Sequence, residues 1–185
     1  MQPVFYYDLG SPECYLVAER IMAELRVVPE WEPVLAAALD VGDRSTDADR
    51  DGIERRARDQ GLQPVRWPAQ WPPDSATAML AATYAKQIGR AVAFSLAAFR
   101  QTFAGGRDLG DESTVLLAAA ACEMHPTAVL KGVALKSVTA ALAAATQRAR
   151  AAGAQTLPTI QVGDDLHHGS DCIERADAAL GALAL

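Results

Sequence analysis

Asparagine is absent from this 185-residue sequence, and cysteine, histidine and lysine occur only three times each. Cys14, Cys122 and Cys172 are too few and too far apart for a disulfide scaffold, although two of them could still meet in space. A zinc site needs clustered cysteine and histidine ligands, and the three histidines do not supply that spacing. We therefore expect neither a disulfide framework nor a bound metal.

Charge and hydropathy exclude further classes of protein. The chain has 17 basic and 23 acidic residues, a net charge of −6, which argues against binding to nucleic-acid phosphates. The apolar run from Val115 to Cys122 is far too short to span a membrane. The N-terminal letters M-Q-P-V-F-Y-Y-D include no basic start and no leucine-rich stretch, so we expect no signal peptide and a cytoplasmic, thiol-reducing setting.

The first 40 residues predict a β-α-β unit. Val4 to Tyr7 is β-branched and aromatic, as strands are. Ser11-Pro12 opens a helix, because serine is a favoured N-cap and proline is tolerated at the first helical position. Apolar residues at helical spacing continue this helix to about Leu25, and Trp31 to Leu35 follows as a second strand. The intervening helix favours a parallel strand pair.

The middle of the chain is predicted to be helical. The Asp- and Arg-rich segment 40–59 is expected to be a solvated face with a short helix at 53–58. Residues 63–74 hold four prolines and two tryptophans, which predicts an ordered loop with aromatic anchors. Apolar spacing predicts helices over 75–103 with a break at Gly89, over 115–123, over 127–135 and over 137–152. The helix over 115–123 is nearly all apolar and is expected to be buried.

Strand character returns near the C-terminus. Residues 159–162 and 166–168 flank the turn signal Gly163-Asp164-Asp165, and Gly169-Ser170-Asp171 then begins a last helix that reaches Leu183. The chain thus reads β-α-β, a helical block, and β-β-α. We predict an α/β fold in which residues 1–40 and 154–185 form one domain and residues 41–153 an all-helical insertion.

Several motifs resemble the DsbA family of thioredoxin-like proteins. The stretch F-Y-Y-D-L-G-S-P-E-C-Y-L at residues 5–16 resembles the start of kappa-class glutathione transferases and 2-hydroxychromene-2-carboxylate isomerases. Those proteins place a strand and an Asp before S-P-x-S-Y-L, where DsbA oxidoreductases carry C-P-x-C-Y. The strings W-P-P-D-S, A-x-x-Y-A, A-F-S-x-A-x-F and T-L-P-T also resemble the isomerase group. The resemblance implies a thioredoxin-like fold with a helical insertion and a site for a small-molecule thiol.

Ser11 is the predicted catalytic residue. It stands at a helix N-terminus, where free N–H groups and the helix dipole favour an anion, and a hydroxyl there can lower the pKa of a bound thiol. The resemblance implies that this thiol is glutathione; the simpler alternative is that Ser11 only caps the helix. Cys14 holds the place of the second cysteine of dithiol enzymes, but Ser11 replaces the first, so dithiol exchange is impossible. Cys14 is either a small buried residue or a resolving or sensor thiol.

The resemblance also implies a set of thiol-binding residues. Pro158 is similar to the cis-proline that the fold places opposite the helix start, and Leu157 would pair through its backbone with the cysteinyl unit of glutathione. The alternative is a trans proline that begins an edge strand. Ser170 and Asp171 would hold the γ-glutamyl end, although Asp171 can also be an N-cap with Glu174 completing a capping box. The predicted set is Pro12, Cys14, Leu157, Pro158, Ser170 and Asp171.

Residues 36–60 depart from the family pattern. Kappa-type proteins supply an Asn and a Lys to the ligand from this region, whereas here the chain has neither residue. Arg44, Arg66 or another arginine could substitute, or the ligand could be a different low-molecular-weight thiol. Trp67 and Trp71 are candidates for the wall of an electrophile pocket, with buried aromatic anchors as the alternative reading.

The leading hypothesis is a glutathione-dependent isomerase or transferase that acts on a small aromatic or conjugated electrophile. A second hypothesis is a DsbA-family thiol oxidoreductase that works through Cys14 alone. A third is a non-catalytic binding protein whose site has decayed. The resemblance further implies a homodimer, and no membrane or nucleic-acid partner is expected.

Overall fold

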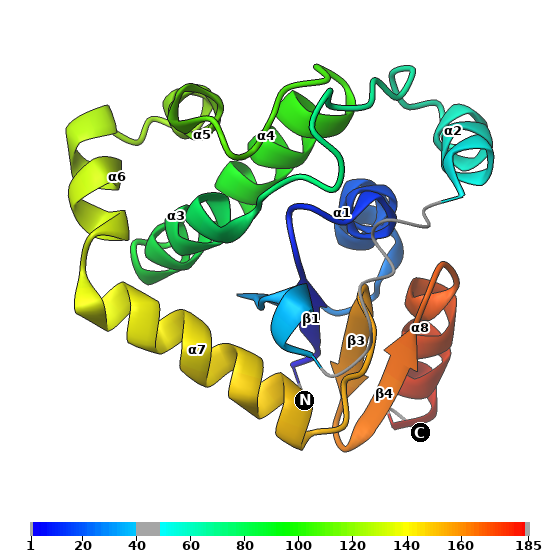
Figure 1. Cartoon of the computed structure of the whole chain (residues 1–185). Helices are drawn as coiled ribbons and strands as arrows, with labels where there is room; N and C mark the ends of the chain where they lie inside the picture. Colours follow the sequence, from blue (N-terminus) through cyan, green and yellow to red (C-terminus); the bar gives the residue numbers. More distant parts are fainter. Residues whose placement is uncertain (1, 40–48, 184–185) are drawn as a thin grey trace.

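A four-stranded mixed sheet forms the centre of the fold (Figure 1). The computed structural model describes residues 2–39 and 49–183. Its strands are β1 (Val4–Tyr7), β2 (Glu30–Pro33), β3 (Thr159–Val162) and β4 (Asp165–His168), in the order β2-β1-β3-β4. β1 and β2 are parallel, while β1–β3 and β3–β4 are antiparallel. The predicted β-α-β and β-β-α ends of the chain are confirmed.

The second strand begins one residue earlier than the sequence predicts and ends two residues earlier. Pro33 is its last residue, and Val34 still donates from its N–H to the Tyr7 carbonyl oxygen at 3.0 Å. Beyond that bond the chain leaves the sheet in a short 3₁₀ helix, η1 (Ala36–Ala38). The residue types from Trp31 to Leu35 indicate a strand, but they do not indicate the residue at which the chain leaves the sheet.

Helices cover both faces of the sheet. Phe5 and Ile160 pair across β1 and β3 and belong to the core cluster that includes α1 (Pro12–Glu24) and α8 (Cys172–Leu183). Tyr6 points to the other face, because alternate strand residues face opposite ways, and it packs in a second cluster with Ala145 of α7 (Lys136–Ala151). In Figure 1, α7 runs along the side of the sheet that lies away from α1 and α8.

The remaining α-helices come between β2 and α7 along the chain. They are α2 (Arg50–Asp59), α3 (Ala76–Gln87), α4 (Ala91–Phe103), α5 (Glu112–Ala121) and α6 (Pro126–Val133). The break at Gly89 is confirmed, with a φ of 73°. The prediction for α5 was wrong in part: the helix begins three residues earlier and Leu117 is 43% exposed, because its apolar letters cover every face while only one face packs.

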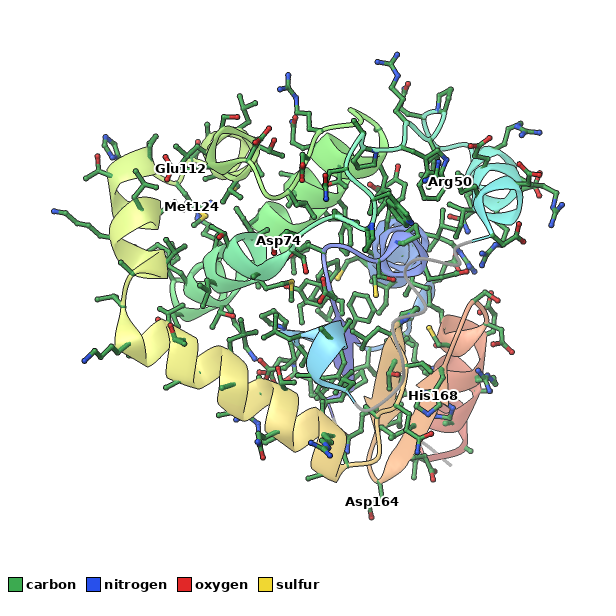
Figure 2. All side chains as sticks on the ribbon, viewed as in Figure 1. Arg50, Asp74, Glu112, Met124, Asp164 and His168 are labelled. Atoms are coloured by element: carbon green, nitrogen blue, oxygen red, sulfur yellow. The ribbon has the colours of Figure 1, made fainter. Side chains whose placement is uncertain are left out.

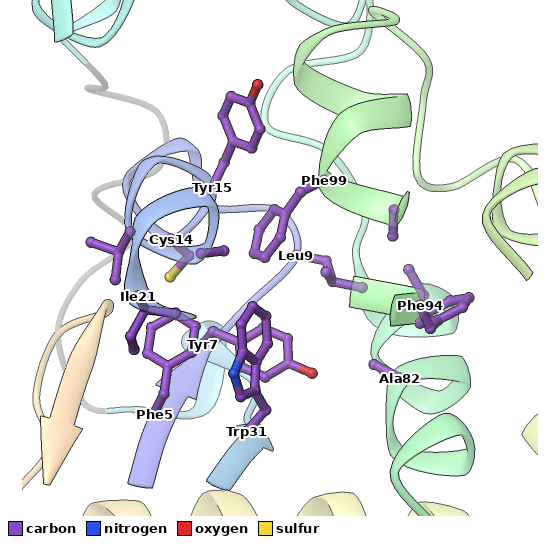
Figure 3. Close-up of a cluster of buried hydrophobic side chains, with 14 of the residues drawn as sticks. Phe5, Tyr7, Leu9, Cys14, Tyr15, Ile21, Trp31, Ala82, Phe94 and Phe99 are labelled. Carbon is purple, nitrogen blue, oxygen red and sulfur yellow. The ribbon is translucent and has the colours of Figure 1, made fainter. Parts of the chain in front are cut away.

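An aromatic cluster joins the sheet to α1 and α4 (Figure 3). The rings of Phe5 and Tyr7 both pack against Trp31, at centroid distances of 5.1 and 5.4 Å. The Tyr7 hydroxyl lies 2.6 Å from the Ser95 hydroxyl on α4, and both side chains are fully buried. Phe99 of α4 packs against Tyr7 and also against Tyr15 of α1. This cluster fixes the start of α1 relative to the helical block.

Within residues 2–39 and 49–183, the helices are short and the metal-ligating side chains are dispersed. No single helix there is both long and apolar enough to cross a bilayer; α6 and α7 reach that length only together, across a bend of 66°. Over the same ranges, no three His, Cys, Asp or Glu side chains gather in a way that could hold a metal ion.

Candidate functional site

Three loops meet at one edge of the sheet. Tyr6 of β1 pairs with Thr159 of β3, which in turn pairs with His168 of β4. β1 therefore ends, β3 begins and β4 ends at the same edge. The segments that follow or precede them, residues 8–11, 157–158 and 169–171, lie together there. A hydrogen bond from the Gly169 N–H to the Pro158 carbonyl oxygen, at 3.2 Å, joins the last two segments directly.

Ser11 caps α1 at this edge. Its Oγ accepts a hydrogen bond from the Cys14 N–H at 3.2 Å, and Pro12 occupies the first helical position, as the sequence predicts. Ser11 is only half-buried. Because the capping bond uses a lone pair of Oγ, the hydroxyl hydrogen stays available for donation, either to the Cys14 sulfur or to a ligand. The capping role and a ligand-binding role of Ser11 are therefore compatible.

Asp8 shapes the loop that carries Ser11. Its side chain is 4% exposed and accepts hydrogen bonds from the Gly10 N–H at 2.8 Å and the Ala36 N–H at 3.0 Å. Burial raises the pKa of the Asp8 carboxyl, and hydrogen bonds that include the Ser75 hydroxyl offset part of this effect. A side chain at Gly10 would meet the Ser75 Cβ at 3.3 Å, so glycine allows this close approach. Asp8 thus ties the loop to two other segments.

The two thiols at this edge are buried. Cys14 and Cys172, at the starts of α1 and α8, are both free and both 0% exposed. Burial raises the pKa of the Cys14 thiol far above its ordinary value, with a smaller opposing effect of the Ser11 hydroxyl. Burial likewise raises the pKa of Cys172, to about 12. This favours the reading of Cys14 as a small buried residue over that of a reactive thiol.

The Leu157–Pro158 peptide bond is cis, as the resemblance implies. Pro158 is buried and Leu157 half-buried at the start of β3. Among the described residues, none accepts a hydrogen bond from the Leu157 N–H. The Thr159 hydroxyl next to this loop contacts His168 Nδ1 at 2.7 Å. Burial is the largest cause that lowers the pKa of His168, followed by the nearby Arg175 and His167 charges.

Ser170 and Asp171 are exposed at the start of α8. Asp171 accepts a hydrogen bond from Arg175 Nη2 at 2.9 Å, and the same guanidinium donates to the His168 carbonyl oxygen. Glu174 forms an ion pair with Arg20 at 2.6 Å instead of reaching back to the helix start. The capping-box alternative is therefore not the arrangement observed, and Asp171 is held by an arginine one turn away.

One face of α2 is docked onto this region, which corrects the expectation of a solvated segment. The helix runs from residue 50 to 59 rather than 53 to 58, with Ile53 and Ala57 buried. Arg56 forms a two-point ion pair with Glu13 of α1; the Nη1–Oε2 distance is 2.7 Å, and Nη2 contacts Oε1. Glu54 accepts a hydrogen bond from Trp67 Nε1 at 2.7 Å. Sequence reasoning missed these residues because charge alone does not show which partner a side chain finds.

Trp67 and Trp71 form an edge-to-face pair with centroids 4.9 Å apart. The guanidinium of Arg50 lies over both rings, 4.8 Å from the Trp67 centroid and 5.5 Å from that of Trp71. Figure 2 labels Arg50 at the start of α2. Within residues 2–39 and 49–183, Arg50 has no carboxylate partner. Trp71 Nε1 is buried and lacks a hydrogen-bond acceptor there. The pair therefore offers half-buried aromatic surface, a cation and an unsatisfied donor.

The loop that carries these tryptophans reaches the edge of the sheet. Pro73 Cγ lies 3.5 Å from the position that a side chain at Gly10 would occupy, next to Ser11. Of the predicted cationic substitutes, Arg44 falls outside the described residues. Arg66 is exposed, and its N–H donates to Phe103 O at the end of α4. Instead, the structure places Arg56 against the first turn of α1 and Arg50 over the tryptophans.

Comparisons with known proteins agree with this architecture. The family model of DSBA-like thioredoxin domains matches residues 4–181. The structure of a 2-hydroxychromene-2-carboxylate isomerase superposes with a TM-score of 0.87 at 21% identity, covering 100% of this chain and 96% of that one. No curated protein matches the chain. The predicted thioredoxin-like fold with a helical insertion is confirmed.

Two more solved structures share the fold. A probable DsbA oxidoreductase from Streptomyces coelicolor has a TM-score of 0.79 at 18% identity, with 98% of this chain and 89% of that one covered. The cytosolic disulfide reductase DsbM from Pseudomonas aeruginosa, solved with GSH, has a TM-score of 0.67 at 14% identity, with both chains fully covered.

Proposed function

This chain belongs to the family of DsbA-like thioredoxin domains, and from that premise we propose that it is a thiol-dependent isomerase or transferase. A small-molecule thiol, glutathione first, binds at the start of α1. Its thiolate adds to an aromatic or conjugated electrophile held beside Trp67 and Trp71. The protein supplies the binding site and the electrostatics, and the ligand supplies the sulfur.

The observation that carries this proposal is the side chain at the start of α1. A dithiol oxidoreductase needs an accessible thiol at this place, whereas this chain presents the Ser11 hydroxyl and buries Cys14 completely. The nucleophilic sulfur must then come from a ligand. The Ser11 hydroxyl and the N-terminal N–H groups of α1 favour the ionised form of that sulfur. The buried Cys14 also disfavours the oxidoreductase alternative.

The rest of the edge offers partners for a peptide-like thiol. The Leu157 N–H, which has no acceptor in the described part of the chain, would pair with the cysteinyl unit of glutathione. The exposed start of α8, with Ser170 and Asp171, would hold the γ-glutamyl end. Arg50 would replace the missing lysine. A different low-molecular-weight thiol with a carboxylate would use the same groups.

The reaction would proceed by addition and elimination. The bound thiol releases its proton to solvent, and the thiolate forms a C–S bond with the β-carbon of a conjugated carbonyl. The electron pair of the C=C bond moves to the carbonyl oxygen as an enolate. Rotation about the resulting single bond, followed by loss of the thiolate, returns the thiol and gives the isomer; protonation of the enolate instead gives the transferase product. Holding both reactants in one site would contribute much of the rate.

The proposal also places the protein in the cytoplasm, the setting that the sequence analysis expects, and as a homodimer, which the family resemblance implies. Analytical ultracentrifugation of the purified chain would test the second point. A single species at the mass of one chain would contradict it.

Turnover measurements test the proposed function. The purified chain is supplied with glutathione and chromene-type or other conjugated carbonyl substrates, and product formation is followed at pH 7. We expect turnover that requires the thiol, and a loss of more than tenfold in Ser11→Ala, equivalent to about 1.4 kcal/mol. Turnover without thiol, or an unchanged rate in Ser11→Ala, would refute the assignment.

A further inference from the structure

The ion pair between Glu13 and Arg56 lies at the first turn of α1, the helix whose N-terminus is the proposed thiol site. Glu13 is the second residue of α1, two positions after the cap Ser11. Both of its carboxylate oxygens contact the guanidinium of Arg56, whose Nε also donates to the Gly52 carbonyl oxygen at 3.3 Å. The two side chains are 37% and 30% exposed. The pair therefore has a defined geometry without being removed from solvent.

A carboxylate in the first turn has two opposing effects. It interacts favourably with the N-terminal end of the helix dipole, so Glu13 stabilises α1. The same charge repels a thiolate bound at that N-terminus and would raise the pKa of the thiol. Arg56 cancels this repulsion, because its positive charge contacts both oxygens of Glu13.

The other charged or titratable groups around the site do not duplicate this arrangement. Asp8 is buried behind the loop, with its carboxyl pKa raised by burial. Cys14 and Cys172 are buried thiols with raised pKa values. At the start of α8, Asp171 is already paired with Arg175.

Three more of the described groups lie around the site. His168 on β4 has a lowered pKa, caused first by burial. Asp49, the N-cap of α2, accepts a hydrogen bond from the Gly52 N–H, and its negative charge helps to raise the pKa of Arg56. Arg50 stacks on the tryptophan pair. Among the described residues, the Glu13–Arg56 pair alone joins two half-buried, opposite charges at the first turn of α1.

We propose that the Glu13–Arg56 ion pair sets the acidity of the thiol bound at Ser11. This inference rests on the proposed function and assigns Arg56 as a positioning residue that acts through Glu13. Removing the positive charge leaves Glu13 unpaired, so the pKa of the thiol rises. Removing the negative charge leaves Arg56 unpaired, so the pKa of the thiol falls. A partly exposed unit charge near the site shifts a pKa by about half a unit, roughly a threefold change in the thiolate-to-thiol ratio.

A reporter thiol tests this without depending on glutathione. The Ser11→Cys substitution, combined with Cys14→Ala, places one sulfur at the start of α1, and the pH dependence of its alkylation rate gives the thiol pKa. We expect Arg56→Gln to raise this pKa and Glu13→Gln to lower it, each by about half a unit. The double variant should return to the starting value. Arg55→Gln, an exposed position on the same helix, serves as the charge-matched control.

The signs of the two shifts decide the outcome. If the ion pair only docks α2 onto α1, both variants undock the helix and shift the thiol pKa in the same direction, and this result would overturn the inference. Shifts no larger than that of Arg55→Gln would overturn it as well. Trp67 donates a hydrogen bond to Glu54 on α2, so its fluorescence independently reports whether α2 undocks from α1.

Glutathione separates this inference from the proposed function. In the chain with its natural Ser11 and Cys14, the ultraviolet absorbance of bound thiolate should follow the same opposite shifts in Arg56→Gln and Glu13→Gln. If glutathione does not bind at all, the proposed function with this thiol fails. The reporter thiol still supports or contradicts the role of the ion pair.

Discussion

Replacing Asp8 by alanine tests how the loop that carries Ser11 is held. The change removes the acceptor for two backbone donors, the N–H groups of Gly10 and Ala36. A buried donor left without a partner costs about 1–3 kcal/mol. Gly10 is half-buried and Ala36 exposed, so water can reach both donors and the lower end of that range applies. Two donors at about 1 kcal/mol each give a loss of about 2 kcal/mol in the free energy of unfolding.

The expected loss is large enough to measure. For a chain of this size, about 2 kcal/mol corresponds to a fall of about 4–8 °C in melting temperature. Because the loop also positions Ser11, the affinity for glutathione should fall by about tenfold, equivalent to about 1.4 kcal/mol. Thermal unfolding and calorimetric titration of the same Asp8→Ala sample give the two numbers.

Asp108→Ala is a matched control for Asp8→Ala. The Asp108 carboxylate also accepts the N–H two residues on, from Gly110 at 2.8 Å, but on the loop between α4 and α5 rather than on the loop that carries Ser11. We expect that variant to lose less than 1 kcal/mol and to bind the thiol normally. The reasoning is refuted if Asp8→Ala is no less stable than Asp108→Ala, or if it is destabilised and still binds glutathione with unchanged affinity.

Three further predictions concern neighbouring groups. The folded-state pKa of His168 is lowered, chiefly by burial, from an ordinary value of 6.5, so its stabilising contribution is present above that pH and is lost as the pH falls through the folded value. When the pH is lowered from 7 to 5, the denaturant midpoint should therefore fall more in the natural chain than in His168→Gln. Equal decreases in the two chains would contradict this. Cys14 is fully buried, so mild oxidation with glutathione should give no mixed disulfide at Cys14 by mass spectrometry unless denaturant is present; a native adduct lost in Cys14→Ala would favour the oxidoreductase. Arg50 lies over the tryptophan pair without a carboxylate partner in the described ranges, so Arg50→Gln should weaken the quenching of tryptophan fluorescence by 2-naphthoate about threefold more than by neutral 2-naphthamide. Equal losses for the two probes would exclude a charge contact.

Local signals in the sequence predict most of the fold. Val4 to Tyr7 is a strand in the prediction and in the structure, because this run of β-branched and aromatic residues is followed by a turn. Ser11-Pro12 marks the start of α1 because capping depends on neighbours along the chain. The bounds of α5 and the end of β2 were misplaced, because packing against other elements decides them. The proposed division into a domain of 1–40 and 154–185 and an insertion of 41–153 stays a prediction.

The candidate site is predictable only in part. Ser11, Leu157 and Pro158 carry motif signals, and the register of β1, β3 and β4 brings their segments to one edge. The docking of α2 carries no such signal. Arg56 meets Glu13 across 43 positions, and Asp/Arg-rich letters fit a solvated helix equally well. Contacts between residues so far apart in the sequence depend on the folded surface and cannot be predicted from the spacing of residues along the chain.

The central claim is that a small-molecule thiol binds at Ser11, and calorimetric titration with reduced glutathione tests it most directly. The account predicts binding of micromolar to low-millimolar strength in the natural chain and clearly weaker binding in Ser11→Ala. The absence of binding heat, together with a melting temperature that does not change at several millimolar ligand, would contradict glutathione as the thiol.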